Sequence, residues 1–222
     1  MSPCRYKLAV FDLDGTLLNT GGGIANALSK TLEGLGFYPH QKTDLTAYIG
    51  PPIEVAFREL LGLEGPSLDD AAAQFRHRYR TQDLLTATPY HGIFELLEEL
   101  RRCKIKTAVA TYKREDYARE LLFHFGFDRY MPVIYGSDTK GLLKKSDIIR
   151  RCMASSGIAD PKEAVMIGDT GEDARGAAGM GVDFIAVTYG FGFQKAEDAA
   201  PYKAVGVAST PMEILPYILK GE

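Results

Sequence analysis

The sequence has little of several features that mark whole classes of protein. Its 222 residues include only three cysteines, which form no C-x-x-C pair and have no histidine at ligand spacing. This favours reduced structural thiols over a disulfide framework or a zinc site. The formal net charge of -3 supplies no basic field for a polyanion, so we expect no nucleic-acid partner.

Long hydrophobic runs are also missing. No stretch approaches the roughly 18 apolar residues of a membrane span, so we expect no membrane association. The apolar stretch before residue 12 is too short for the hydrophobic region of a signal peptide, which favours a cytoplasmic location. A hydrophobic content of 45% and a charged content of 25% are typical of a globular protein.

Short apolar runs alternate with amphipathic segments from residue 89 to the C-terminal end. Because the runs are apolar on successive residues, they predict strands buried on both faces, and the segments between them predict helices. Repeated alternation of this kind is typical of a mostly parallel sheet covered by helices. The predicted strands are 6–12, 105–111, 132–136, 164–169 and 183–190, and the predicted helices are 92–103, 114–127 and 146–158.

Residues 17–88 have a different pattern. Apolar residues such as Ile24, Leu28 and Leu32 recur at helical spacing, and no strand pattern separates the amphipathic segments. The sequence therefore predicts an α/β fold in two parts. Residues 1–16 and 89–222 form a Rossmann-like parallel-sheet core, and residues 17–88 form an inserted all-helical cap domain. An insert at this point would set a lid beside the residues that follow the first strand.

Polar side chains able to do chemistry follow three of the predicted strands. Asp12 and Asp14 end the first strand, Thr111 ends the second, and Asp169 ends the fourth, with Asp173 four residues further on. Ligands of open parallel sheets bind at the carboxyl ends of the strands. Each residue alone has an ordinary interpretation as a turn or helix-cap residue, but their joint placement favours a functional site.

The spacing of Asp12 and Asp14 suits chemistry on two sides of one reacting centre. Residues two apart on an extended chain point the same way with α-carbons roughly 6.5 to 7 Å apart, so one carboxylate can attack while the other handles a proton. Several carboxylates in one cleft repel one another unless a divalent cation holds them, and Mg²⁺ suits such a group together with a phosphate oxygen. A hydroxyl and a lysine beside it would neutralise a phosphoryl group. Lys113 follows Thr111, and Lys144 and Lys145 open a predicted helix that could reach the same edge.

Together these motifs resemble the haloacid dehalogenase superfamily of phosphohydrolases, and within it the phosphoglycolate-phosphatase-like group with a helical cap. The similarity covers nearly the whole chain. It rests on FDLDGTLLNT at 11–20, VATYK at 109–113, the lysine near KKSDII at 144–149, IGDTGEDARGAAGMG at 167–181 and the cap loop YIGPP at 48–52.

The resemblance implies a role for each acidic residue of these motifs. Asp12 would be the nucleophile that forms an aspartyl-phosphate. Asp14 would protonate the leaving oxygen and then activate water. Asp12, the backbone carbonyl of Asp14, and Asp169 would hold Mg²⁺, and Asp173 would support the metal shell.

The resemblance also implies which residues bind the phosphoryl oxygens. Thr111 and Lys145 would do so, and Lys145 fits the spacing to the following DII better than the adjacent Lys144, although the usual Lys-Pro is absent. Tyr112 stands where the group commonly has asparagine. A basic cluster in the insert is interpreted as a solvated helix face, with contact to an anionic substrate as the alternative; it consists of Arg76, His77, Arg78 and Arg80.

The predicted function is that of a Mg²⁺-dependent phosphatase acting through an aspartyl-phosphate. Its partner would be a small phosphorylated metabolite, such as a phosphoglycolate-like compound, a nucleotide or a sugar phosphate, and the oligomeric state is left open. A phosphosugar mutase is the alternative, because the same intermediate can return its phosphoryl group to a sugar. A receiver-type signalling module or a non-catalytic phospho-ligand binding protein would be a different class, against which the helical insert and the intact set of aspartates argue.

Overall fold

The computed structural model describes residues 4–38, 43, 45–50, 52–138 and 143–219. The chain divides into two compact units. One unit, here called the core unit, comprises Met1–Asn19 and Pro89–Glu222. The other, here called the helical unit, comprises Thr20–Thr88. The sequence placed the corresponding boundaries at residues 17 and 88.

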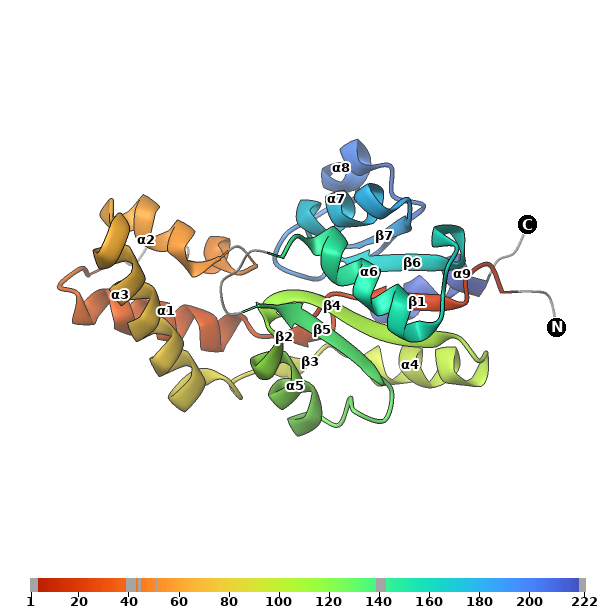
Figure 1. Cartoon of the computed structure of the whole chain (residues 1–222), viewed down its shortest axis with the longest axis horizontal. Coiled ribbons are helices and arrows are strands. Elements are labelled where there is room, and N and C mark those ends of the chain that lie inside the picture. The colour runs from red at the N-terminus through yellow and green to blue at the C-terminus, as the bar shows by residue number, and fades with distance from the viewer. Residues whose placement is uncertain (1–3, 39–42, 44, 51, 139–142, 220–222) are drawn as a thin grey trace. The chain divides into compact units, whose positions relative to one another are not determined.

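The core unit contains a six-stranded sheet in the order β5-β4-β1-β6-β7-β8, in which every neighbouring pair is parallel (Figure 1). This arrangement confirms the predicted α/β, Rossmann-like fold class. The first strand of the chain lies in the interior of the sheet, between β4 and β6. The strands are β1 (Leu8–Phe11), β4 (Lys106–Arg114), β5 (Val133–Ser137), β6 (Ala164–Gly168), β7 (Asp183–Val187) and β8 (Gly206–Ala208).

Helices cover both faces of this sheet (Figure 1). On one face α6 and α7 pack against each other, and Ile148, Ile149 and Ala177 form a buried cluster with Val10 and Met166 of the strands. On the other face lie α4 and α5; α4 buries Ile93, Leu96, Leu97 and Leu100, the spacing of one helix stripe. The helices are α4 (Ile93–Arg102), α5 (Glu115–His124), α6 (Lys145–Ser156), α7 (Gly171–Met180), α8 (Ala196–Ala199) and α9 (Leu215–Leu219).

The helical unit is built from α1 (Gly21–Gly34), α2 (Ile53–Leu61) and α3 (Gly65–Arg78). A π-helical segment, Tyr79–Asp83, continues α3. Leu28 and Phe57 are fully buried in this unit, and the Asn26 side chain donates a hydrogen bond to Asp83 at 2.7 Å. Two short strands, β2 (Leu18–Asn19) and β3 (Thr88–Pro89), pair with each other where the chain leaves and re-enters the core unit.

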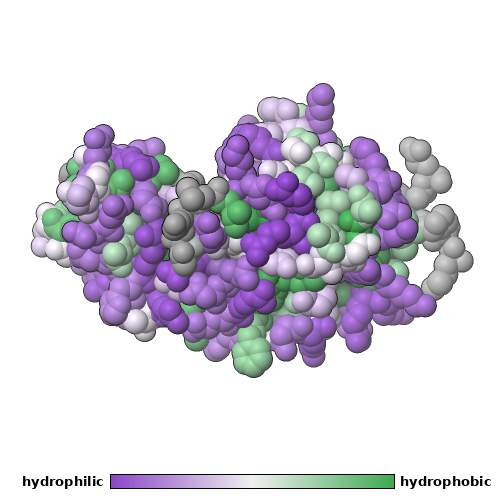
Figure 2. Space-filling view, in the orientation of Figure 1, coloured by the Kyte–Doolittle hydropathy of each residue, from purple (hydrophilic) through white to green (hydrophobic). Residues whose placement is uncertain are grey.

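In the view of Figure 2, hydrophilic residues predominate on both units, and hydrophobic residues show as a smaller area on the core unit. Some exposed apolar surface is normal for a protein. Within the described ranges, no helix is both long and apolar enough to cross a membrane.

Candidate active site

The site begins at Asp12, the residue that follows the buried strand β1. The Asp12 N–H donates to the carbonyl of Ile167 at 2.9 Å, which continues the pairing with β6 for one residue beyond the strand. The chain then turns tightly around Leu13, whose carbonyl accepts hydrogen bonds from the N–H groups of three following residues. This turn holds the side chains of Asp12 and Asp14 at the carboxyl end of β1, and both residues are at least nine-tenths buried.

Gly15 is required in this turn for two reasons. Its φ of +83° lies in the left-handed region that favours glycine, and a β-carbon at this position would lie 2.3 Å from Asp169 Oδ2. The Gly15 of the D-x-D-G-T motif therefore lets the carboxylate that follows β6 approach the backbone that follows β1. The two strand ends converge because this residue has no side chain.

Asp169 follows β6 and is fully buried. Its Oδ2 accepts hydrogen bonds from the N–H groups of Phe191 at 2.8 Å and Gly192 at 3.0 Å, and Thr16 Oγ1 lies 3.4 Å from its Oδ1. Burial, and secondarily the negative charge of Asp173, raise the pKa of Asp169 to about 6. The carboxylate is thus fixed in orientation but costly to keep ionised without a nearby cation.

Asp173 is placed by the first turn of α7. Its Oδ2 accepts hydrogen bonds from Thr170 N at 3.1 Å and Thr170 Oγ1 at 2.6 Å, and its own N–H donates to Thr170 Oγ1, which together form a capping box. Asp173 therefore both caps the start of α7 and lies in the group of three aspartates. Its other oxygen, Oδ1, faces the Lys145 ammonium at 2.7 Å.

Lys145 is the first residue of α6 and its side chain is only 3% exposed. Its Nζ lies 2.6 Å from Asp12 Oδ1 and 2.7 Å from Asp173 Oδ1, so one ammonium bridges two carboxylates from different elements. Lys144, the residue before the helix, is exposed. Of the two lysines considered from the sequence, the structure brings Lys145 into the group of aspartates.

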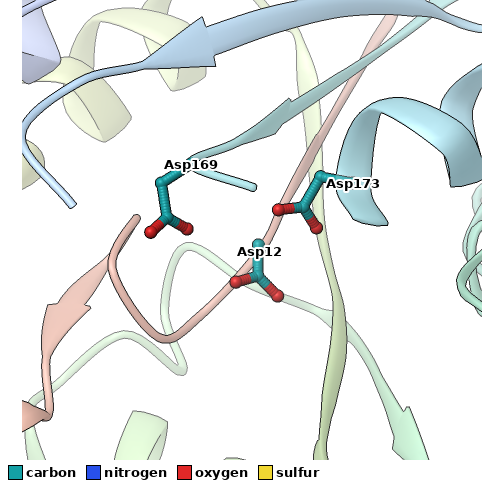
Figure 3. Close-up of side chains that lie close together, drawn as sticks. All are labelled: Asp12, Asp169 and Asp173. Atoms are coloured by element: carbon teal, nitrogen blue, oxygen red, sulfur yellow. The ribbon is translucent and has the colours of Figure 1, made fainter. Parts of the chain in front are cut away.

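Three carboxylate oxygens, one each from Asp12, Asp169 and Asp173, lie within 4.8 Å of one another, and Figure 3 shows the three side chains close together. Burial raises the pKa of Asp12 to about 8; the Lys145 ammonium opposes this shift, and the other carboxylates add to it. One lysine does not balance this much negative charge. A small hard cation with oxygen ligands fits the donor set.

The strand β4, which pairs with β1 on its other side, contributes a second group of residues. Its register pairs Val109 with Phe11, and the buried Thr111 lies two residues further along, with its Oγ1 accepting a hydrogen bond from the N–H of Lys113 at 3.1 Å. The Lys113 ammonium lies 3.0 Å from Asp14 Oδ1, and the two side chains are 7% and 10% exposed.

From the sequence, Lys113 is one of the polar residues at the end of the second predicted strand, but its pairing with Asp14 was not predicted. A signal was available, because residues two apart on a strand point the same way, so Lys113 shares the direction of Thr111. Each of these two buried charges has lost most of its hydration, and the attraction of the opposite charge at 3.0 Å offsets that cost.

Comparisons with known proteins agree with this architecture. A family model described as haloacid dehalogenase-like hydrolase matches residues 9–187. The chain is 38% identical over 189 residues to a 5'-nucleotidase of Pseudomonas aeruginosa, covering 85% of each chain. It is 32% identical over 191 residues to a phosphoglycolate phosphatase of Agrobacterium fabrum, covering 83% of this chain and 81% of that protein.

A relative with a different activity in its name has similar identity. The chain is 36% identical over 188 residues to the tyrosine-protein kinase PtkA of Mycobacterium tuberculosis; the match covers 84% of this chain but 63% of that protein. Among solved structures, a haloacid dehalogenase-like hydrolase from Streptococcus pneumoniae has a TM-score of 0.87 at 30% identity and covers 96% of this chain and 98% of its own.

The core unit combines a parallel sheet, buried aspartates after β1 and β6, and a bridging lysine from α6. Together with the family match, this fold and site are those of a hydrolase. This chain belongs to the haloacid dehalogenase-like hydrolase family. The resemblance drawn from its sequence motifs is confirmed.

Proposed function

We propose that this chain is a Mg²⁺-dependent phosphatase that hydrolyses a small phosphomonoester through an aspartyl-phosphate on Asp12. The predicted enzyme class, a phosphatase of this family, is confirmed by the family match and by relatives with phosphatase names. The substrate, the metal and the role of each residue are the proposed part. The observation that carries the proposal is the convergence of Asp12, Asp169 and Asp173 on one point beside the Lys145 ammonium.

The first step is attack of an Asp12 carboxylate oxygen on phosphorus. A bond forms between that oxygen and phosphorus, the ester bond from phosphorus to the leaving oxygen breaks, and the leaving oxygen takes a proton from Asp14. Thr111 and Lys145 bind phosphoryl oxygens, so that the ammonium shifts from neutralising carboxylates to stabilising the transferred group. Lys113, whose ammonium lies 3.0 Å from Asp14 Oδ1, holds this side chain in place and stabilises the carboxylate that forms when the proton leaves.

The second step returns the enzyme to its starting state. Asp14, now a carboxylate, accepts a proton from a water molecule whose oxygen attacks phosphorus. The bond between phosphorus and Asp12 breaks, inorganic phosphate leaves, and the Asp14 proton is ready for the next turnover. Two steps with lower barriers thereby replace one difficult displacement.

The metal ligands in this proposal are Asp12, Asp169 and the backbone carbonyl of Asp14, with Asp173 supporting them. Bound Mg²⁺ would neutralise these carboxylates and the phosphoryl charge. The oxygen-only donor set and the raised pKa values of Asp12 and Asp169 support a cation at this point.

The substrate class follows from the family context. One relative is named a 5'-nucleotidase and another a phosphoglycolate phosphatase, which supports a small phosphorylated metabolite as the substrate. We propose that the helical unit acts as the cap. The cytoplasmic location predicted from the sequence stays a prediction, and the phosphosugar mutase stays the alternative.

The test is phosphate release from a panel of phosphomonoesters, including nucleoside monophosphates, sugar phosphates and phosphoglycolate. Wild type and Asp12→Asn are compared with Mg²⁺ and with EDTA, and Asp128→Asn, an exposed aspartate, is the matched control. We expect release that needs both Mg²⁺ and Asp12. Undiminished release by Asp12→Asn would overturn the mechanism, and phosphoryl exchange between sugars without release would favour the mutase.

A further inference from the structure

Tyr112 contacts residues on both sides of the proposed site, since it follows Thr111 on β4 and touches Lys145 of α6. It takes no part in either proposed chemical step. The side chain is partly buried against the core cluster beneath α6 and α7. Its hydroxyl accepts a hydrogen bond from the backbone N–H of Lys145 at 3.0 Å. The centre of its ring lies 5.2 Å from Lys145 Nζ. One side chain therefore contacts both the backbone and the ammonium of the same lysine.

The hydroxyl contact fixes where α6 begins. The first N–H groups of a helix have no acceptor within the helix, and Lys145 is the first residue of α6. The preceding residue supplies no side-chain cap for this N–H; its own N–H is held by Asp147 Oδ2 at 3.2 Å. Tyr112 thus ties the N-terminus of α6 to the carboxyl end of β4, the strand beside β1.

The ring contact bears on the direction of the ammonium. A cation over an aromatic face is attracted by the ring, and the attraction is larger where water is excluded. The lysine stem also packs closely on α7, because a β-carbon on Gly176 would lie 2.7 Å from Lys145 Cβ. The stem is therefore in contact with both Tyr112 and α7, and its ammonium reaches Asp12 and Asp173.

We propose that Tyr112 is a positioning residue that sets the place of Lys145, and through it the affinity of the site for a phosphoryl group. This inference rests on the proposed function. The tyrosine acts through both its hydroxyl and its ring, and a residue without an aromatic face could not make the second contact. A small displacement of a positioned group costs activity steeply.

The experiment compares Tyr112→Phe, which removes the hydroxyl, and Tyr112→Leu, which also removes the ring. The matched controls are Tyr135→Phe and Tyr135→Leu. Tyr135 also packs on the core cluster, shares a hydrogen bond with Ser155 and lies under the Arg151 guanidinium, but it is on β5 and does not contact Lys145. The readouts are kcat and KM for p-nitrophenyl phosphate, and the affinity for inorganic phosphate with Mg²⁺ by calorimetry.

We expect kcat/KM and phosphate affinity to fall roughly 3- to 10-fold in Tyr112→Phe and roughly 10- to 100-fold in Tyr112→Leu, with the Tyr135 variants close to wild type. A double-mutant cycle separates positioning from packing. In a Lys145→Met background, Tyr112→Leu should change the residual activity and affinity by less than about twofold, because the tyrosine acts through the lysine.

Three results would overturn the inference: wild-type affinity and turnover in Tyr112→Leu, an equal loss in Tyr135→Leu, or an equal loss from Tyr112→Leu with and without Lys145. A wild-type protein that binds phosphate but releases none from any ester would overturn the proposed function alone, since the affinities would still decide the role of Tyr112. A wild-type protein that does neither would overturn both.

Discussion

The core unit and the helical unit differ in where they put charge. Of the described aspartates, glutamates, lysines and arginines, five that are buried as whole residues belong to the core unit and one, Asp83, belongs to the helical unit. The five in the core unit all lie at the proposed site; they are Asp12, Asp14, Lys145, Asp169 and Asp173. In the helical unit, charged side chains pair at the surface, as Arg76 does with Glu54.

The difference follows from the two architectures. Parallel strands bring the residues that follow them to one edge of the sheet, so polar side chains from distant parts of the sequence meet there. Amphipathic helices bury one apolar stripe and leave their charges outside. Substitution of the buried charged residues in the core unit should therefore change catalytic activity. Substitution of charged residues in the helical unit should do little more than remove surface ion pairs.

The largest effect that we expect in this comparison is the loss of turnover on substitution of Asp14. Asp14→Asn should lower turnover by roughly 10²- to 10⁴-fold, the contribution expected of a general acid and base, while inorganic phosphate and Mg²⁺ still bind. Stopped assays with the best ester, together with calorimetry, check this. Because the substitution removes the partner of the buried Lys113, the double variant Asp14→Asn with Lys113→Met serves as a charge-balanced control. Wild-type turnover in either variant would remove Asp14 from the mechanism.

A smaller effect is expected from Mg²⁺ on thermal stability, and its size depends on pH. The pKa of Asp12 is raised to about 8 and that of Asp169 to about 6, from an ordinary value near 3.8. A raised folded-state pKa means that the stability contributed by the protonated form is fully present below about pH 4 and is lost as pH rises through 6 and then 8. In the proposed function Mg²⁺ would bind the ionised carboxylates, so added Mg²⁺ should stabilise the protein most at the pH where that loss is complete.

Thermal unfolding with and without Mg²⁺ at pH 5 and pH 8.5 measures this. At a Mg²⁺ concentration 100 times the Kd, we expect Tm to rise by roughly 5 to 10 °C at the higher pH and by much less at the lower one. Asp169→Asn should abolish the rise, and the exposed-site variant Asp128→Asn should keep it. An equal rise at both pH values would contradict a metal held by Asp12 and Asp169.

The smallest expected effect lies in the helical unit. Arg76→Ala removes a partly exposed ion pair, in which the two side chains are 36% and 23% exposed, and should lower the free energy of unfolding by no more than about 1 kcal/mol. Activity on p-nitrophenyl phosphate should be unchanged. Arg101→Ala, which removes the exposed pair with Glu98 in the core unit, is the matched control. A loss of activity in Arg76→Ala as large as that in Asp14→Asn would break the distinction between the units.

The sequence was sufficient to predict the site residues that directly follow a buried strand. Asp12 and Asp169 each end an apolar run, and parallel pairing of those runs brings their ends together whatever lies between them in the sequence. The five buried strands predicted for the core correspond to β1, β4, β5, β6 and β7. The edge strand β8 went unpredicted because three residues, Gly206–Ala208, are too few to show a pattern.

The parts that depend on tertiary packing could not be read in the same way. Whether Lys144 or Lys145 enters the site depends on the residue at which α6 begins, since successive helical residues point about 100° apart. One contact at that start comes from Tyr112, which lies 33 residues away in the sequence and accepts a hydrogen bond from the N–H of Lys145. The pairing of Lys113 with Asp14 likewise depends on the close approach of β4 to the turn after β1.

The central claim, that Asp12 carries the phosphoryl group, is tested most directly by trapping. The wild-type protein is mixed with Mg²⁺ and its best substrate, quenched, and reduced with borohydride, which converts an aspartyl-phosphate to homoserine, and the peptide containing residue 12 is sequenced by mass spectrometry. The account predicts homoserine at position 12, dependent on substrate and not formed at position 14. Phosphate release with homoserine at another position, or with none at all, would contradict it.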